Sequence, residues 1–132
     1  MSWAGHKGKK GTHGLYGWRD LAADITRQRL IIEGTLHSPF GAEQMTQYCN
    51  EITSVLGMTK VTSPVCNHDP EYGWCAYMHW KESGMHIYSW DERNPPFFSV
   101  DIYTCTAFEP MDAVRYTEEF FGEQLISLVF KE

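Results

Sequence analysis

The sequence predicts a two-layer α+β sandwich, in which two helices pack on one face of a mainly antiparallel sheet. Two observations support this fold class. Apolar residues recur at helical spacing in two segments, residues 42–56 and 109–121. Between and around them lie short segments rich in β-branched and aromatic residues, separated by Gly- and Pro-containing breaks. The two helices and the longer strands give the order β-α-β-β-β-α-β.

The first half of the chain is expected to form a strand, a helix and a short second strand. Residues 30–35 are predicted as the first strand. The helix over residues 42–56 ends at Gly57, a residue type that commonly stops helices. Residues 59–62 are predicted as a short strand and residues 63–72 as a polar loop. The apolar face of the helix is expected to consist of Met45, Tyr48, Cys49, Ile52, Val55 and Leu56.

The second half is expected to contribute four strands and one helix. The helix starts at Glu109-Pro110 and runs to about Phe121, where Gly122 ends it. Residues 81–84 are predicted as the turn between the first two strands. The four predicted strands are residues 74–80, 85–90, 97–105 and 124–130.

Length and charge place limits on function. The 132 residues are enough for one compact domain, expected over residues 28–132 after a basic, Gly-rich tail over residues 1–27. Residues 1–29 hold six bases and two acids, a net charge of +4, and the remainder holds five bases and fifteen acids, a net charge of −10. The acidic body argues against nucleic acid and suits a small cationic substrate. The basic tail could instead dock on a neighbouring acidic subunit.

Cysteine usage and hydropathy suggest a cytoplasmic protein. No apolar run is long enough to span a membrane, and the N-terminus lacks the apolar core of a signal peptide. Four cysteines without CxxC spacing favour a reducing compartment over a disulfide framework. Cys66, His68 and Cys75 fit no standard zinc spacing, so no metal is expected.

The most informative motif is the pair Glu82-Ser83, which lies between two predicted strands. Cys105 follows about twenty residues later, at the end of the strand containing Asp101-Ile102-Tyr103-Thr104. This layout resembles the self-cleaving core of the pyruvoyl-dependent, prokaryotic-type S-adenosylmethionine decarboxylases. The order of elements is also similar to that family's fold, over roughly residues 28–131. Taken alone, Ser83 could be a surface turn residue and Cys105 a half-buried strand residue.

The resemblance implies a mechanism for these residues. In the family the serine, here Ser83, attacks the carbonyl of the preceding residue, here Glu82, and forms an ester. Elimination then breaks the chain and leaves a pyruvoyl cofactor derived from Ser83, which absorbs the electrons released on decarboxylation. A cysteine acid, matched by Cys105, returns a proton to the product. The expected substrate is S-adenosylmethionine, and the product is the aminopropyl donor for spermidine synthesis.

Two further segments resemble substrate-binding motifs of the family. Trp90-Asp91-Glu92 is similar to a Trp-Pro-Glu motif whose Glu binds the substrate ribose, which makes Trp90 and Glu92 substrate-binding candidates. Glu33-Gly34-Thr35 is similar to a Glu-Gly-Thr segment whose Glu lines the active site, where a carboxylate could complement a cation. Alternatively, Glu92 is a solvated turn acid and Glu33 an edge-strand acid. The candidates for stacking on adenine are Phe40, Tyr72 and Trp74.

Two departures from the family pattern leave alternatives open. Tyr88 stands where the family has a histidine that assists self-cleavage, and His86 lies two residues earlier on the same strand face. Cys75 stands where the family has a second processing serine. The role of the family histidine could pass to His86 or Tyr88. Two alternative functions remain beside the decarboxylation of S-adenosylmethionine. One is the same chemistry on ornithine or arginine, and the other is that of an uncleaved homologue that only binds.

Assembly follows from the fold class. Helices on one sheet face leave the other face uncovered, and family members pair so that both subunits contribute to each active site. A homodimer or larger homo-oligomer is therefore expected, with Glu33, Ser83, His86 and Cys105 near its interface. His37, His68 and His79 are expected to be surface or loop residues.

Overall fold

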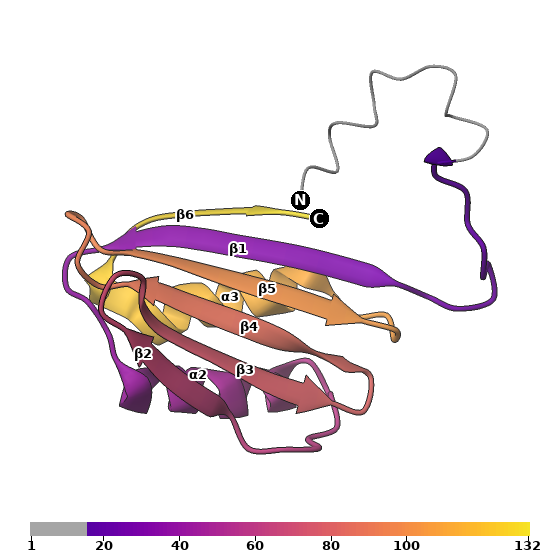
Figure 1. Cartoon of the computed structure of the whole chain (residues 1–132), viewed down its shortest axis with the longest axis horizontal. Coiled ribbons are helices and arrows are strands. Elements are labelled where there is room, and N and C mark those ends of the chain that lie inside the picture. Colours follow the sequence, from indigo (N-terminus) through magenta and orange to yellow (C-terminus); the bar gives the residue numbers. More distant parts are fainter. Residues whose placement is uncertain (1–15) are drawn as a thin grey trace.

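The computed structural model describes residues 16–132 as a six-stranded, wholly antiparallel sheet with two helices. The sheet order is β2-β3-β4-β5-β1-β6 (Figure 1). The strands are β1 (Gln28–Leu36), β2 (Val65–Asp69), β3 (Gly73–Trp80), β4 (Ser83–Trp90), β5 (Phe97–Thr104) and β6 (Leu125–Lys131). The helices are α2 (Ala42–Val55), α3 (Pro110–Phe121) and the short 3-10 turn η3 (Gly122–Gln124). The predicted α+β class is confirmed.

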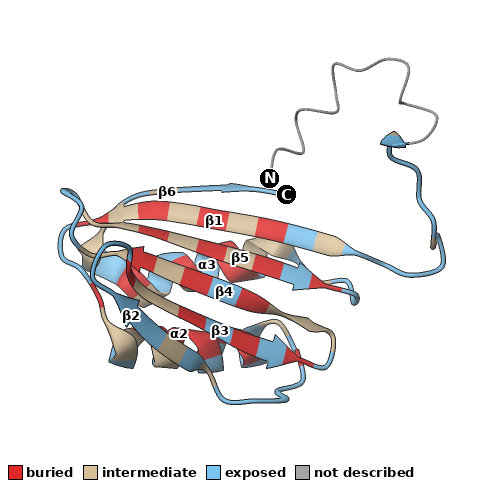
Figure 2. Cartoon of the chain, viewed as in Figure 1, coloured by how far each residue is buried: buried red, intermediate tan, exposed pale blue. Residues whose placement is uncertain are grey.

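Both helices cover the same face of the sheet, as predicted (Figure 1). Side chains alternate between the two faces of a strand, and Figure 2 shows this alternation as buried stripes along the central strands. In β1, Leu30, Ile32 and Leu36 are fully buried under the helices. Arg29 and Glu33, which point to the other face, are more exposed. The hydrophobic core therefore lies entirely between the helix layer and one sheet face.

A buried hydroxyl pair joins the two helices. The phenol of Tyr48 on α2 lies 2.7 Å from the hydroxyl of Thr117 on α3, and Thr117 in turn donates to the carbonyl of Ala113 at 2.7 Å. The proton of Thr117 is thereby used, so Tyr48 is the donor. Burial raises the pKa of the Tyr48 phenol above its ordinary range, which keeps that donor proton in place.

The helix ends follow the predicted signals. The side chain of Glu109 accepts a hydrogen bond from the Met111 backbone N–H, and Pro110 occupies the first helical position, where no N–H is needed. Gly122 and Gly57 follow the two helices with φ values of 53° and 68°. Such values are easily adopted only by glycine, so these residues end the helices.

The segment between α2 and β3 differs from the prediction. Residues 65–69, predicted as loop, form the edge strand β2, whereas residues 59–62 form only an isolated bridge between Lys60 and Trp80. The short strand between α2 and β3 is therefore β2, at residues 65–69, and not the predicted residues 59–62. Most β2 side chains are exposed, so the strand lacks the apolar alternation that would have revealed it.

Two smaller expectations were also wrong. The predicted turn over residues 81–84 is a two-residue turn, Lys81-Glu82, because Ser83 and Gly84 already pair with β3 and β5. Val55, predicted on the buried face of α2, is 41% exposed, and Thr53 is buried in its place. The hydroxyl of Thr53 accepts from the Trp80 indole at 2.9 Å and donates to the Cys49 carbonyl at 2.7 Å, which makes its burial possible.

The predicted N-terminal tail lies partly outside the described residues, because residues 1–15 are not described. From residue 18 to β1 the described chain contains no helix or strand. The boundary at residue 28 coincides with the start of β1. In the described part of the chain, neither helix has the length and apolar character needed to cross a membrane.

Candidate active site

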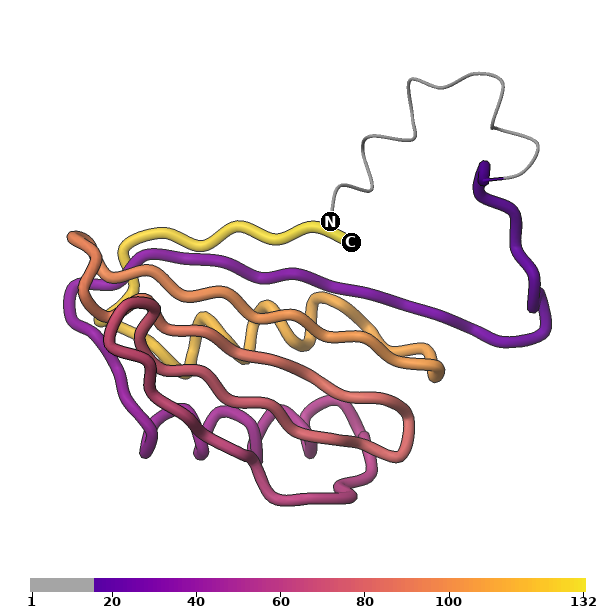
Figure 3. Tube along the Cα trace, in the orientation of Figure 1, coloured from indigo at the N-terminus to yellow at the C-terminus, as the bar shows by residue number. Residues whose placement is uncertain are grey.

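The candidate site is built at one end of the sheet, around the hairpin that joins β3 to β4. Ser83 is the first residue of β4 and lies opposite Trp80 of β3 and Thr104 of β5. The hairpin turn and the residue that follows β5 therefore lie at the same end of the sheet, on the right of Figure 3. This register brings the predicted cleavage site next to Cys105, although more than twenty residues of chain separate them.

The backbone at Ser83 is strained. Ser83 has a φ of 136°, and among the described residues other than glycine no other has a positive φ. A side chain at such φ values clashes with the backbone, which destabilises the folded state by about 1–3 kcal/mol. Such strain persists only where surrounding contacts hold the residue, and it is concentrated at functional sites. The strained residue here is the serine of the predicted junction.

A hydrogen bond fixes the carbonyl that Ser83 would attack. The backbone N–H of Cys105 donates to the carbonyl oxygen of Glu82 at 2.8 Å. A donor at this position would stabilise negative charge that develops on the oxygen during attack. Cys105 follows the end of β5 directly, and its side chain is exposed. The backbone of Cys105 therefore lies directly beside the Glu82-Ser83 junction.

A cavity of about 530 Å³ adjoins Ser83 on the helix-free side of the sheet. Its volume suits a ligand of drug or nucleoside size. The side chains around it come from four strands: Arg29 on β1, Tyr77 and His79 on β3, His86 on β4, and Asp101 and Tyr103 on β5. Of these, His86 alone was a candidate from the sequence. His79, expected as a surface residue, is exposed but lines this cavity.

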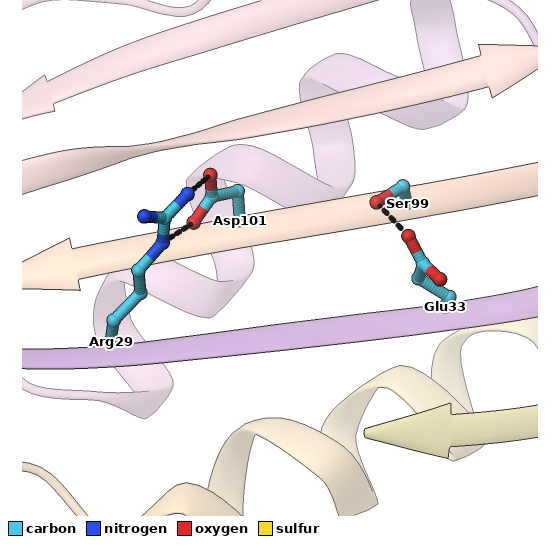
Figure 4. Close-up of polar contacts among 4 residues, drawn as sticks. All are labelled: Arg29, Glu33, Ser99 and Asp101. Carbon is cyan, nitrogen blue, oxygen red and sulfur yellow. Dashed lines mark hydrogen bonds and ion pairs between the residues drawn. The ribbon is translucent and has the colours of Figure 1, made fainter. Parts of the chain in front are cut away.

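An ion pair forms one wall of the cavity. Arg29 contacts Asp101 through two hydrogen bonds, Nε to Oδ1 at 3.0 Å and Nη2 to Oδ2 at 2.7 Å (Figure 4). These bonds raise the pKa of Arg29 above its ordinary value. Neither residue was predicted as a site residue. The sequence shows that the two residues carry opposite charges, but it does not show that their strands, β1 and β5, are neighbours.

His86 and Tyr88 are placed differently relative to the cavity. Their rings stack with centroids 5.9 Å apart and planes 6° apart, as expected for side chains on the same strand face. His86 lines the cavity, whereas Tyr88 lies further along β4, opposite Cys75 on β3. Burial, followed by the charge of Asp101, raises the pKa of Tyr88. Tyr88 is therefore held neutral beside Cys75, away from Ser83.

Glu33 does not reach this cavity within one chain. It lies on β1 opposite Ser99, whose hydroxyl donates to Glu33 Oε2 at 2.8 Å (Figure 4). Glu33 lines a separate, smaller hollow of about 160 Å³ between β1 and β6. Within one subunit, Glu33 and Ser83 therefore line different hollows.

Within one subunit, Trp90 and Glu92 also lie far from Ser83 in space. Trp90 is the last residue of β4 and Ser83 is the first, a separation of roughly 23 Å at about 3.3 Å per residue. The Trp90 ring packs against Tyr88 and Phe97. Glu92 is exposed in the β4–β5 turn. The two ends of β4 cannot contribute to one site without a second copy of the sheet.

None of the three aromatic residues suggested for adenine stacking lines the cavity. Phe40 is 3% exposed and packs against Phe98 and Phe121 in the core. Trp74 packs near Gly41, and Tyr72 is exposed before β3. The aromatic rings that do line the cavity are Tyr77 and Tyr103, 45% and 47% exposed, which the sequence did not single out.

Comparison with known families agrees with this geometry. No curated protein matches the chain significantly. A model of the S-adenosylmethionine decarboxylase family matches residues 40–130, more than two thirds of the chain. The matched segment contains the strained Glu82-Ser83 junction, the strands β3 to β5 that surround the cavity, and Cys105. The chain therefore belongs to the S-adenosylmethionine decarboxylase family.

Proposed function

We propose that this protein is a self-cleaving, pyruvoyl-dependent decarboxylase of prokaryotic type that acts on S-adenosylmethionine. The product would be the aminopropyl donor for spermidine synthesis. One observation carries the proposal: a strained Ser83 follows a carbonyl held by the Cys105 N–H, beside a cavity of about 530 Å³. Family membership supplies the reaction class. The four cysteines of the described chain are unpaired, which agrees with a cytoplasmic setting.

The junction fits the chemistry that forms a pyruvoyl group. The Ser83 hydroxyl oxygen attacks the Glu82 carbonyl carbon, and the Glu82–Ser83 amide becomes an ester as the proton moves to the Ser83 nitrogen. The Cys105 N–H stabilises the negative charge on the Glu82 oxygen. Removal of the Ser83 α-proton then expels the C-terminal carboxylate of Glu82, which separates residues 1–82 from residues 83–132 and leaves a dehydroalanine at position 83. The dehydroalanine tautomerises to an imine, and water replaces its nitrogen, which leaves as ammonia, so residue 83 becomes the pyruvoyl group.

Once formed from Ser83, the pyruvoyl group would serve as the electron sink for decarboxylation. The residues around it must bind the substrate, exclude water and move protons. The Cys105 thiol, just beyond the end of β5, is the proposed acid that returns a proton to the product α-carbon. Tyr77 and Tyr103 offer aromatic faces for an adenine or a sulfonium cation.

His86 is the stronger candidate for the proton-transfer role of the family histidine. It lines the cavity beside Ser83, whereas Tyr88 pairs with Cys75 further along β4. In this proposal His86 removes a proton during cleavage, and Tyr88 orients the His86 ring by stacking at 5.9 Å. Cys75 would have only the indirect role of supporting Tyr88.

A homodimer would account for the substrate-binding candidates that one chain separates. If two helix-free sheet faces pack with opposite strand directions, the Trp90 end of one β4 lies over the Ser83 end of the other. Trp90 and Glu92 of one subunit would then reach the substrate bound beside Ser83 of its partner. Glu33, near the middle of the same face, would lie at the interface.

A second substrate class is favoured by one observation. None of the aromatic residues first suggested for adenine, Phe40, Tyr72 and Trp74, lines the cavity. Tyr77 and Tyr103, which do line it, are about half exposed, so the cavity would also suit ornithine or arginine. The substitutions at Tyr88 and Cys75 leave a third possibility, an uncleaved homologue that only binds.

An intact mass spectrum of the purified protein and of Ser83→Ala tests the proposal. The wild type should give two chains, 1–82 and 83–132, with the second starting in a carbonyl group that reacts with hydrazides. Ser83→Ala should give one uncut chain without decarboxylase activity. A wild type that remains one chain and is inactive on S-adenosylmethionine, ornithine and arginine would overturn the enzyme assignment. Cleavage with preference for ornithine or arginine would overturn only the substrate.

A further inference from the structure

The side chain of Glu82 is held by a residue that the proposed reaction does not use. One carboxylate oxygen, Oε1, accepts the backbone N–H of Thr59 at 2.9 Å. The other, Oε2, accepts the Thr59 hydroxyl, also at 2.9 Å. These bonds, the backbone N–H first, lower the pKa of Glu82, so the carboxylate stays charged at neutral pH. Thr59 thus binds both side-chain carboxylate oxygens of Glu82, the residue just before the proposed cleavage site.

Thr59 is itself well anchored. The preceding residue, Met58, is buried, and its N–H donates to the Thr53 carbonyl of α2 at 2.9 Å. The Thr59 carbonyl accepts the N–H of Lys81 at 2.9 Å. Val61 donates to the His79 carbonyl at 3.1 Å on the adjacent strand. Thr59 therefore connects the rigid end of α2 to the turn of the β3–β4 hairpin.

Glu82, the residue before the bond that would break, is consequently held at two points. Thr59 binds the backbone of Lys81 and the side-chain carboxylate of Glu82. The Cys105 N–H binds the Glu82 carbonyl oxygen at 2.8 Å. Strained backbone such as that of Ser83 relaxes unless its neighbours are fixed. The contacts of Thr59 and Cys105 with Glu82 oppose this relaxation.

We infer that Thr59 is a positioning residue for self-cleavage: its hydroxyl and N–H hold Glu82 so that the Glu82 carbonyl faces the Cys105 N–H and Ser83 keeps its strained backbone. This inference rests on the proposed function. Thr59 contacts neither the Ser83 hydroxyl nor the cavity. It acts through Glu82, by keeping the carbonyl carbon in place while the Ser83 oxygen bonds to it and the amide C–N bond breaks.

The test follows the cleavage of newly translated full-length chain on timed denaturing gels, a readout independent of decarboxylase activity. Thr59→Val keeps the shape and the backbone N–H but lacks the hydroxyl. It should slow cleavage about tenfold, the effect of losing one hydrogen bond to a charged group. Thr59→Ser keeps the hydroxyl and should restore a rate near that of the wild type.

A matched control removes a threonine hydroxyl bond elsewhere. Thr35 on β1 shares a hydrogen bond with Ser127 of β6 at 2.6 Å, away from the hairpin. Thr35→Val should cleave at the wild-type rate. Urea unfolding of Thr59→Val in the uncleavable Ser83→Ala chain shows whether the fold is intact, so that slow cleavage is not mistaken for misfolding.

The outcomes separate the two proposals. Wild-type cleavage between residues 82 and 83 with an equal rate in Thr59→Val would overturn the role of Thr59 and leave the proposed function standing. Slowing in Thr59→Val that Thr59→Ser does not rescue would also overturn it. A wild type that never cleaves would overturn both proposals.

Discussion

Ser83 combines a reactive side chain with an unfavourable backbone. Its φ of 136° suits glycine, but glycine has no hydroxyl and could not form an ester. A serine at this position is therefore explained by chemistry rather than by stability. Proteins commonly retain strain where a site requires it, with neighbouring contacts holding the strained residue. Here those contacts are the Cys105 N–H and the Thr59 hydroxyl, both bound to Glu82.

This view of Ser83 can be tested without any catalysis. Ser83→Gly and Ser83→Ala both lack the hydroxyl, so both chains should remain uncut. Glycine usually destabilises a strand relative to alanine, but here it relieves the strained φ. We expect the glycine variant to be more stable by about 1 kcal/mol, because strain of about 1–3 kcal/mol outweighs the flexibility that glycine adds to the unfolded chain.

The measurement is the free energy of unfolding in urea for the two uncut variants, compared at equal denaturant slope. A glycine variant that is equally stable or less stable would show that residue 83 is not strained in the folded protein. The same pair of substitutions at Ser99, which is not a positive-φ residue, should show the ordinary order, with alanine more stable.

At the scale of single residues, a short motif singled out Ser83 and Cys105 as candidates. The structure places the Cys105 N–H against the Glu82 carbonyl, next to Ser83. Arg29 and Asp101 were missed because their contact depends on β1 pairing with β5, and a helix and three strands lie between these two strands in the chain. A linear sequence with no related sequences to compare does not reveal which strands are neighbours. The side chains that line a cavity formed by four strands are therefore the hardest to predict.

At the scale of elements, the two helices share a buried polar contact in addition to their aromatic packing. Tyr48→Phe removes the phenol that donates to Thr117, while Thr117 keeps its own bond to Ala113. We expect a loss of about 1 kcal/mol in the free energy of unfolding, the usual net value of a neutral hydrogen bond. Urea unfolding in the uncut Ser83→Ala chain measures it without interference from cleavage.

The matched control is Tyr116→Phe on α3, whose ring is half-buried beside Tyr48. The Tyr116 hydroxyl donates to Glu51 at 2.6 Å, but Glu51 is exposed and water can replace the lost partner. This variant should lose less than half as much stability as Tyr48→Phe. Equal losses in both variants would mean that burial of the Tyr48 pair adds nothing.

The predicted elements were most accurate where one side of the element is buried. α2, α3 and the strands β1, β3, β4 and β5 each bury a regular apolar set, and their periodicity predicted them. β2 was missed because it is an edge strand whose exposed residues carry no alternation. The turn at Lys81-Glu82 was predicted two residues too long because Ser83-Gly84 resembles turn sequence, while backbone pairing to β3 and β5 makes both residues part of the sheet.

At the scale of the whole molecule, the helix-free face of the sheet carries the candidate site. Tyr77 and Tyr103 are about half exposed on it, and Val129 is 63% exposed. Trp90 and Glu92 lie at one end of this face, and Ser83 at the other. Since the two ends are roughly 23 Å apart, the proposed roles of Glu92 and Ser83 are compatible only if different subunits supply them. Shared sites therefore follow from the proposal as a geometric requirement.

Mixed dimers test this requirement directly. Ser83→Ala should be inactive, and Glu92→Gln should bind S-adenosylmethionine about 10- to 100-fold more weakly, because a charged hydrogen bond to the ribose is lost. The two variants are co-expressed with different tags, and dimers that carry both tags are purified. If sites are shared, each mixed dimer contains one site with both substitutions and one site with neither, so it should recover about half of wild-type activity at low substrate concentration. If each chain built its own site, one site would be inactive and the other would carry Glu92→Gln, so the activity would be about half that of the Glu92→Gln dimer. Ornithine and arginine have no ribose, so an enzyme that prefers either one should show no effect of Glu92→Gln.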